Sequence, residues 1–229
     1  YLESLDEVKR SYSYMFPKLD FKGEIRTNNI VKNCAKQSGK KLLFFSGGVD
    51  ATSSLIDILE SKPMLCTLWG SDIYLKDTEG WNVVNRNVIR AGKEYNLDTT
   101  FIKTSFRDIL NYEILNNRFA KPNHENWWHG FQHGMAILTH AAPISFAYGL
   151  DEVNIAATAS VKSKEDYLCA STPIIDNNVK FCGCRCVHEG YENSRNDKVR
   201  KICTYSKKNN VNINLRVCWE TRTGYNCCV

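Results

Sequence analysis

Apolar residues recur along this chain in two spacings that alternate with each other. Short apolar or alternating runs predict five strands, at residues 41–45, 64–68, 99–103, 153–157 and 211–217. Helical spacing between these runs predicts helices at residues 50–60, 77–95, 105–115, 128–148 and 192–208, the third capped by Ser105 with Asp108 and the fourth interrupted by Pro143. Because strands alternate with helices, we predict an α/β fold with a doubly wound, parallel five-stranded sheet.

The first predicted strand opens into the sequence Ser-Gly-Gly-Val-Asp-Ala-Thr, residues 46–52. Gly47 and Gly48 let backbone N–H groups approach an anion, and the first turn of the next helix attracts phosphate oxygens. Thr52 adds a hydroxyl donor. Asp50 would repel a phosphate unless a cation lay between them, so we predict that Asp50 holds Mg²⁺ against a polyphosphate.

The same residues have a structural explanation. A strand-to-helix turn also uses glycines, and Asp50 or Thr52 could cap the helix. The Walker pattern Gly-x-x-x-x-Gly-Lys-Ser/Thr and the dinucleotide pattern Gly-x-Gly-x-x-Gly are both absent from the sequence.

Residues 46–52 resemble the PP-loop of the ATP pyrophosphatase superfamily, whose signature is Ser-Gly-Gly-x-Asp-Ser/Thr. Ser46, Gly47, Gly48 and Asp50 match by position, whereas Ala51 stands where a hydroxyl residue is usual. The resemblance implies an adenine nucleotide alpha hydrolase-like sheet with strand order 3-2-1-4-5. It also implies that the loop, with Thr52 in place of the missing hydroxyl, grips the pyrophosphate of ATP during cleavage to AMP and pyrophosphate.

In such sheets ligands bind beyond the carboxyl ends of the strands, at the switch in strand order. By the resemblance, that switch lies between the first and fourth strands. Trp69 and Gly70 follow the second strand, where a ring and bare backbone could hold the adenine; a Trp packed at the sheet rim is the alternative. Lys162, with Lys164 in reserve, follows the fourth strand and is our candidate to stabilise the transition state, unless both lysines are merely solvated.

A polar and aromatic segment, residues 123–134, contains His129 and His133 at helical spacing. They could share a metal with His124 or Glu125, but we favour a role in lining a substrate or nucleotide pocket. Arg195 could clamp a substrate carboxylate through two hydrogen bonds.

Ten cysteines are present, and those of segment 169–229 are the informative ones. Cys182, Cys184 and Cys186 alternate, so they could bind a metal, carry a persulfide or be inert thiols. Cys218 and Cys227 resemble the first two zinc ligands of 7-cyano-7-deazaguanine synthase-like proteins, which implies a Zn²⁺ site that is truncated, altered or completed from the cluster of Cys182, Cys184 and Cys186.

The composition suits an ordinary globular protein, with 43% hydrophobic residues, 24% charged residues and a net charge of +5 among 229 residues. We predict an N-terminal helical extension at 1–38 and a PP-loop domain at 39–229. No apolar run approaches the length of a membrane span and no leader is recognisable, so we expect a cytoplasmic protein without membrane contact. The positive charge suits ATP but is too weak to argue for nucleic acid; a homodimer stays open.

Together these features predict an enzyme that adenylates a small-molecule substrate, a carboxylate, with ATP and Mg²⁺, after which a nitrogen nucleophile displaces AMP. One alternative is an ATP-dependent sulfur transferase acting on tRNA or a small molecule, with a cysteine of the Cys182 group as carrier. A second alternative is a non-catalytic nucleotide-binding protein, in which Ala51 marks lost catalysis.

Overall fold

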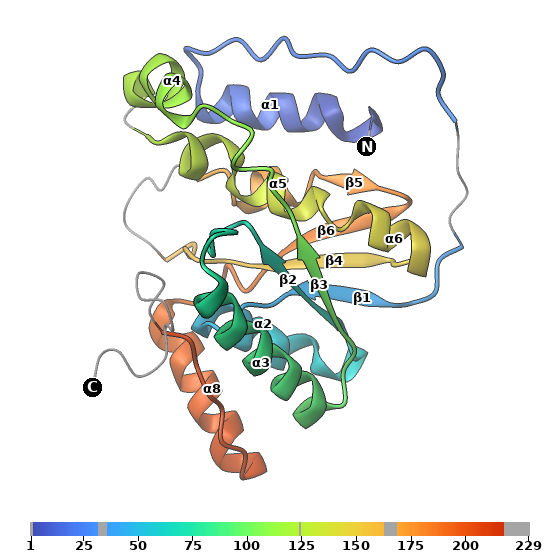
Figure 1. Cartoon of the computed structure of the whole chain (residues 1–229), viewed down its shortest axis with the longest axis vertical. Helices are drawn as coiled ribbons and strands as arrows, with labels where there is room; N and C mark the ends of the chain where they lie inside the picture. Colours follow the sequence, from blue (N-terminus) through green and yellow to red (C-terminus); the bar gives the residue numbers. More distant parts are fainter. Residues whose placement is uncertain (1, 32–35, 124, 163–168, 218–229) are drawn as a thin grey trace. The chain divides into compact units, whose positions relative to one another are not determined.

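The computed structural model describes residues 2–31, 36–123, 125–162 and 169–217 of the chain. It is an α/β structure with a mostly parallel sheet, as the alternation of strands and helices predicts (Figure 1). The strand order is β3-β2-β1-β4-β6-β5. The chain divides into two compact units, one of residues 1–40, 111–153 and 167–188, and the other of residues 41–110, 154–166 and 189–229.

The second of these units contains the predicted phosphate loop, so we call it the loop unit. Its strands and helices are β1 (Lys41–Phe44), α2 (Val49–Ile58), the 3-10 helix η2 (Leu59–Ser61), β2 (Met64–Trp69), α3 (Thr78–Tyr95), β3 (Thr99–Lys103) and α8 (Arg195–Asn209). Strand β4 (Glu152–Ala156) and strand β6 (Cys184–Glu189) each have residues in both units.

The first unit, which we call the helical unit, holds most of the short helices. Its elements are η1 (Leu2–Ser4), α1 (Leu5–Met15), α4 (Tyr112–Leu115), the π-helix η3 (Asn116–Ala120), η4 (Lys121–Asn123), the π-helix η5 (Trp128–Gln132), α5 (His133–Thr139), α6 (Ala142–Tyr148), α7 (Pro173–Asp176) and β5 (Lys180–Phe181). Helix α1 is anchored within this unit, because the Tyr12 hydroxyl donates to the Phe131 carbonyl at 2.9 Å and the Phe16 ring stacks on the Phe131 ring at 4.4 Å.

The first four strands lie where the sequence predicts them. Strands β1 and β2 pair in parallel with Leu43 opposite Leu65, and β2 pairs in parallel with β3 with Leu65 opposite Thr99. Leu43 and Leu65 are fully buried, as are Val84 and Val88 of α3, which packs against β2 and β3. Continuous apolar runs are expected for parallel strands that are covered on both faces. The switch in strand order falls between β1 and β4, as predicted.

The prediction of a fifth strand at residues 211–217 is wrong. These residues are extended but belong to no strand, and the place beside β4 is taken by β6. Arg185 N donates to Asp151 O, and further along both strands Ala157 N donates to Glu189 O. Residue numbers therefore rise in the same direction along β4 and β6, so the two strands are parallel. The five-strand sheet is therefore corrected to six strands, and the alternation of residues 211–217 reports extended backbone rather than sheet pairing.

Two of the six strands, β5 and β6, form a hairpin that the sequence pattern does not predict. Strand β5 pairs antiparallel with β6, and Phe181 lies opposite Cys184. The two linking residues, Cys182 at φ 54° and Gly183 at φ 73°, both adopt the left-handed conformation of a two-residue hairpin turn. The turn takes Cys182 out of the strand, so the predicted alternation holds for Cys184 and Cys186 alone.

Two predicted helices also need correction. The helix placed at 105–115 begins at Tyr112, because the side chain of Asn111, rather than Ser105 or Asp108, accepts the Ile114 N–H at 3.1 Å. The long helix predicted at 128–148 is divided into η5, α5 and α6. Pro143 lies in the first turn of α6, where its missing N–H breaks no hydrogen bond of the helix.

Within the described part of the chain, none of the helices combines the length and apolar character needed to cross a lipid bilayer.

Candidate functional site

The predicted phosphate loop joins β1 to α2 in the loop unit. Gly47 has φ +76°, and Gly48 is the residue before the helix, with no side chain capping the first turn. Neither Asp50 nor Thr52 is therefore the helix cap that the structural explanation required. Among the described residues, no side chain caps the N–H groups of the first turn, so they stay available to an anion; Gly48 N, just before the helix, makes a long contact of 3.4 Å with Ser46 Oγ. Ala51 and Thr52 are both buried.

Asp50 lies in the first turn of α2 and is bound by two cations from α8. Lys198 Nζ donates to Asp50 Oδ1 at 3.0 Å, and Arg195 approaches Asp50 Oδ2 at 3.1 Å. The Lys198 side chain is 1% exposed, that of Asp50 19% and that of Arg195 54%. Lys198 also donates to the carbonyl of Ala157, which follows β4. A buried ammonium thus stands at the switch between β1 and β4, beside the predicted phosphate loop.

Sequence reasoning did not single out Lys198. Its signal was its position, because Lys198 and Arg195 are three residues apart and share one face of a helix. Ser194 and Asp197 cap this helix reciprocally. Arg195, which we predicted to clamp a substrate carboxylate, binds the Asp50 carboxylate of this chain instead.

Lys162, our candidate for transition-state stabilisation, lies on the surface of the loop unit. Its Nζ donates to Asp197 Oδ2 at 2.8 Å, and its side chain is 59% exposed. Bonds from Lys162 and Ser194 hold the pKa of Asp197 well below its ordinary value. Lys164 lies outside the described residues.

The predicted adenine contact, Trp69, is engaged by its own unit. Its ring stacks on Trp81 with centroids 5.1 Å apart, its Nε1 donates to the Tyr74 carbonyl at 3.1 Å, and the Lys103 ammonium lies 4.7 Å from its ring centroid. These contacts support the packing alternative for Trp69. Gly70 has φ +108°, and a Cβ on it would lie 1.8 Å from the Thr104 carbonyl oxygen, so close backbone approach explains this glycine.

The two predicted histidines have separate partners in the helical unit. His129 Nδ1 lies 2.8 Å from Glu125 Oε2, whereas His133 Nδ1 lies 3.6 Å from Cys169 Sγ. Among the residues that the structure describes, no group of three or more His, Cys, Asp or Glu side chains could hold a metal ion. His124, and the predicted zinc ligands Cys218 and Cys227, lie outside the described residues.

A buried polar cluster lies close to His133 in the same unit. Asp176 Oδ2 accepts from Ser171 Oγ at 2.8 Å and lies 2.7 Å from His188 Nδ1. Burial raises the pKa of Asp176, and the bonds from His188 and Ser171 oppose that rise. Asp176 also lies against Gly134, where a Cβ would be 2.3 Å from Asp176 Oδ1. The cluster therefore lies where α5 packs against α7.

Two cysteines of the predicted sulfur-carrying group are poor nucleophiles. Cys184 and Cys186 are 1% and 3% exposed, and burial raises the pKa of the Cys184 thiol to about 11 and that of Cys186 above its ordinary value. The thiolate is the reactive form of cysteine. Cys182, in the hairpin turn, is partly exposed and points its Sγ to the Ala142 carbonyl at 3.6 Å.

We expect this burial to govern alkylation of the native protein by iodoacetamide. A thiol with a pKa of about 11 is ionised to about one part in a thousand at pH 8, so Cys184 should react at least ~100-fold more slowly than the exposed Cys203. Peptide mass spectrometry after timed labelling measures both rates, and labelling in denaturant is the control. Comparable rates for Cys184 and Cys203 in the native protein would contradict the assigned burial.

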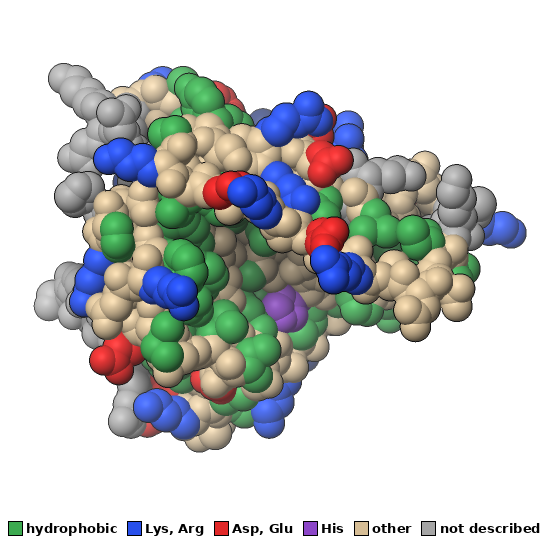
Figure 2. Space-filling model, turned by 90° about the horizontal axis from the view of Figure 1, so that it is seen from above, with side chains coloured by type: hydrophobic (Ala, Val, Ile, Leu, Met, Phe, Trp, Pro, Cys, Tyr) green, Lys and Arg blue, Asp and Glu red, His purple; other side chains and the backbone are tan. Residues whose placement is uncertain are grey.

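The charges of the surface do not form a continuous basic face in the view of Figure 2. Lys and Arg side chains are interspersed there with Asp, Glu and apolar side chains. Among the described side chains drawn there, Lys and Arg do not gather into the basic patch or stripe that is the usual electrostatic footprint of a nucleic-acid-binding protein.

Comparison with known protein families and with characterised protein sequences gave no match for this chain.

Proposed function

We propose that this chain is a PP-loop ATP pyrophosphatase that cleaves ATP to AMP and pyrophosphate while adenylating a substrate carboxylate, which a nitrogen nucleophile then attacks. The observation that carries the proposal is the buried contact of Lys198 with Asp50 beside Gly47 and Gly48. This contact lies at the switch in strand order, where ligands of doubly wound sheets bind.

The chemistry assigned to these residues is electrostatic. N–H groups at the start of α2 would bind the departing pyrophosphate, whose negative charge suits the positive end of the helix. Lys198 has three N–H donors and directs two at Asp50 and Ala157. Its third N–H has no acceptor within the described part of the chain, so it could donate to a phosphate oxygen as negative charge develops there.

Asp50 fits a metal that arrives with the nucleotide. Lys198 binds Asp50 Oδ1 and Arg195 binds Asp50 Oδ2. Each carboxylate oxygen has a further lone pair that a cation can use. Mg²⁺ is usually held by one or two carboxylates together with substrate phosphates, so a larger cluster of acidic side chains is not required. When bound, the ion would supply charge neutralisation to the polyphosphate.

The test is to identify the products of ATP cleavage. With ATP labelled on the α-phosphate and a panel of carboxylates, we expect labelled AMP and equimolar pyrophosphate. Asp50→Asn should lower this turnover by at least ~100-fold. Formation of ADP and phosphate would overturn the proposal. Nucleotide binding without cleavage, across the panel, would favour the non-catalytic alternative.

The sulfur-transferase alternative now depends on Cys182, because Cys184 and Cys186 are buried. A nitrogen-transferring enzyme should keep its turnover in Cys182→Ser. Loss of product formation in that variant, with AMP release retained, would favour sulfur transfer.

A further inference from the structure

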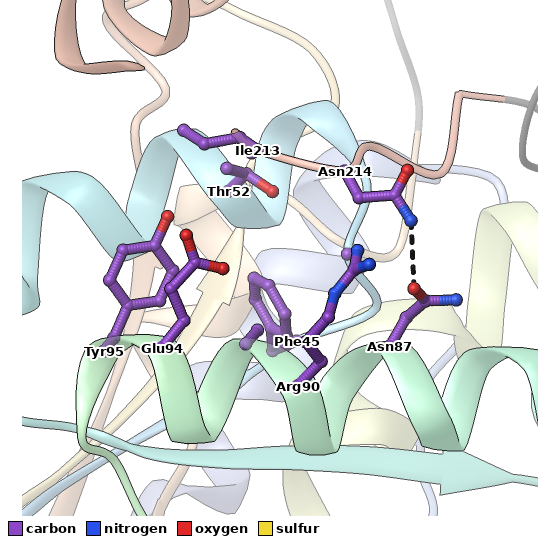
Figure 3. Close-up of a pocket in the computed structure, with 10 residues that line it drawn as sticks. Phe45, Thr52, Asn87, Arg90, Glu94, Tyr95, Ile213 and Asn214 are labelled. Carbon is purple, nitrogen blue, oxygen red and sulfur yellow. Dashed lines mark hydrogen bonds between the residues drawn. The ribbon is translucent and has the colours of Figure 1, made fainter. Parts of the chain in front are cut away.

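A strap of extended chain, residues 211–217, lies over the phosphate loop within the loop unit. It leaves the end of α8 through two bonds, from Ser206 Oγ to the Val211 carbonyl at 2.6 Å and from Val211 N to the Ser206 carbonyl at 3.1 Å. Further along, Asn214 Nδ2 donates to Asn87 Oδ1 of α3 at 2.9 Å (Figure 3). These bonds fix the strap to two helices.

The strap meets the loop at Arg216. Arg216 N donates to the Gly47 carbonyl at 2.8 Å. A Cβ built on Gly48 would lie 3.5 Å from the Arg216 carbonyl oxygen, so the backbone of Arg216 lies directly against both glycines of the loop. The residue is thereby fixed beside the N–H groups that we propose to bind pyrophosphate.

Beneath the strap is a cavity of about 20 Å³, which has room for about one water molecule. Ile213 and Asn214 of the strap face it from one side, Thr52 of α2 borders it, and Arg90 of α3 extends toward it (Figure 3). Ile213 and Asn214 of the strap therefore cover one side of the loop.

Arg216 differs from the other cationic residues near the loop in the partners of its side chain. Its Nε atom is buried and has no hydrogen-bond partner, and no carboxylate within the described residues forms an ion pair with it. By contrast, Arg195 and Lys198 both form an ion pair with Asp50. An unsatisfied buried donor destabilises a folded protein, and such a group calls for an explanation such as a missing ion.

We propose that Arg216 binds the phosphates of the nucleotide, and that the strap exists to hold it over the phosphate loop. This inference rests on the proposed nucleotide site and adds a residue to it. Arginine suits the role because its fork of N–H groups matches phosphate oxygens. The charges divide accordingly: Lys198 and Arg195 share the Asp50 carboxylate, with one N–H of Lys198 left for the anion, whereas Arg216 pairs with no carboxylate of the described residues.

The test measures affinity for inorganic pyrophosphate, for ATP with Mg²⁺ and for adenosine by calorimetry, on the full chain. Arg216→Gln should weaken binding of pyrophosphate and of ATP by about 10–100-fold, the range expected for a charged hydrogen bond, and leave adenosine affinity unchanged. Arg216→Lys should recover part of the loss. The matched control is Arg200→Gln, because the Arg200 side chain is 77% exposed and pairs with Asp197 on the same helix.

Each outcome bears on the inference. Pyrophosphate affinity of Arg216→Gln within ~2-fold of wild type would overturn the role of Arg216 and leave the nucleotide site standing. An equal loss of adenosine affinity would also overturn it, because the strap would then act through packing alone. Wild-type protein that binds neither pyrophosphate nor ATP would overturn the nucleotide site and this inference together. Loosening the strap by Asn214→Ala should weaken pyrophosphate binding by a smaller factor than Arg216→Gln.

Discussion

Replacing Lys198 with methionine should lower ATP-dependent release of pyrophosphate by about 100–1000-fold. Lys198 is a buried cation beside the proposed pyrophosphate site, since it binds Asp50 of α2 and the carbonyl of Ala157, which follows β4. Removing one preorganised donor from a water-excluded site typically costs a factor of this size. Methionine keeps much of the side-chain volume, so the variant changes the charge more than the packing.

The matched control for Lys198 is Lys162→Met. Lys162 is an exposed cation whose partner, Asp197, also belongs to α8. If Lys162 only forms a surface ion pair with Asp197, its loss should change turnover by no more than about 3-fold, because exposed ion pairs contribute little free energy. A large loss in Lys162→Met with full activity in Lys198→Met would reverse the two roles and restore the role that the sequence suggested for Lys162.

Folding of the Lys198 variant has to be measured beside its activity. Removing one partner of a buried ion pair can cost about 3–5 kcal/mol, although Asp50 keeps Arg195 and is partly exposed. Circular dichroism and thermal unfolding show whether the variant is folded at the assay temperature. A folded Lys198→Met protein with wild-type pyrophosphate release would contradict the assigned role.

Replacing Gly70 with alanine should destabilise the protein by about 3 kcal/mol, or lower its Tm by roughly 6–12 °C. The residue has φ +108°, a backbone conformation that side chains disfavour, and the new Cβ would lie 1.8 Å from the Thr104 carbonyl oxygen. That oxygen belongs to backbone that is itself tied to β2, because Thr104 N donates to the Trp69 carbonyl at 2.9 Å. The clash can be relieved only by moving main chain.

Gly23→Ala is the control for Gly70→Ala. Nothing lies within 4 Å of a Cβ built at Gly23, and its φ is not in the left-handed region. We expect a change in unfolding free energy of no more than about 0.5 kcal/mol there. Urea or thermal unfolding measures both variants. Equal stability of the Gly70→Ala variant and wild type would show that the glycine is not needed for this backbone contact, and would return weight to its predicted contact with adenine.

Local pattern predicted much of the framework of the loop unit. The run of residues 41–45 and the spacing of 77–95 contain enough apolar periodicity to place β1 and α3 within a residue or two of their observed bounds. The turn between β1 and α2 is also a local feature, because two glycines are followed there by a hydroxyl-rich helix start. Such features depend on neighbours in sequence.

The strand β6 was missed because its buried side chains are not of the usual apolar kinds. Cys184, Cys186 and His188 face inward and alternate with outward or partly exposed residues. A buried histidine is tolerated there because Asp176 binds it at 2.7 Å, and that partner is invisible to a periodicity argument. Residues 211–217 show a cleaner alternation of apolar and polar side chains, which predicts a strand there instead.

The sequence by itself determined the class of fold, the first four strands and the loop with its acidic residue, because each is written in the spacing of neighbouring residues. Only the tertiary structure decided which side chains meet that loop. Lys198 reaches Asp50 across 148 positions of sequence. Arg216 reaches Gly47 because extended backbone of residues 211–217 crosses the loop rather than joining the sheet. Alternation of apolar and polar side chains shows that a segment is extended. Which extended segment pairs beside β4 depends on packing between segments far apart in the sequence.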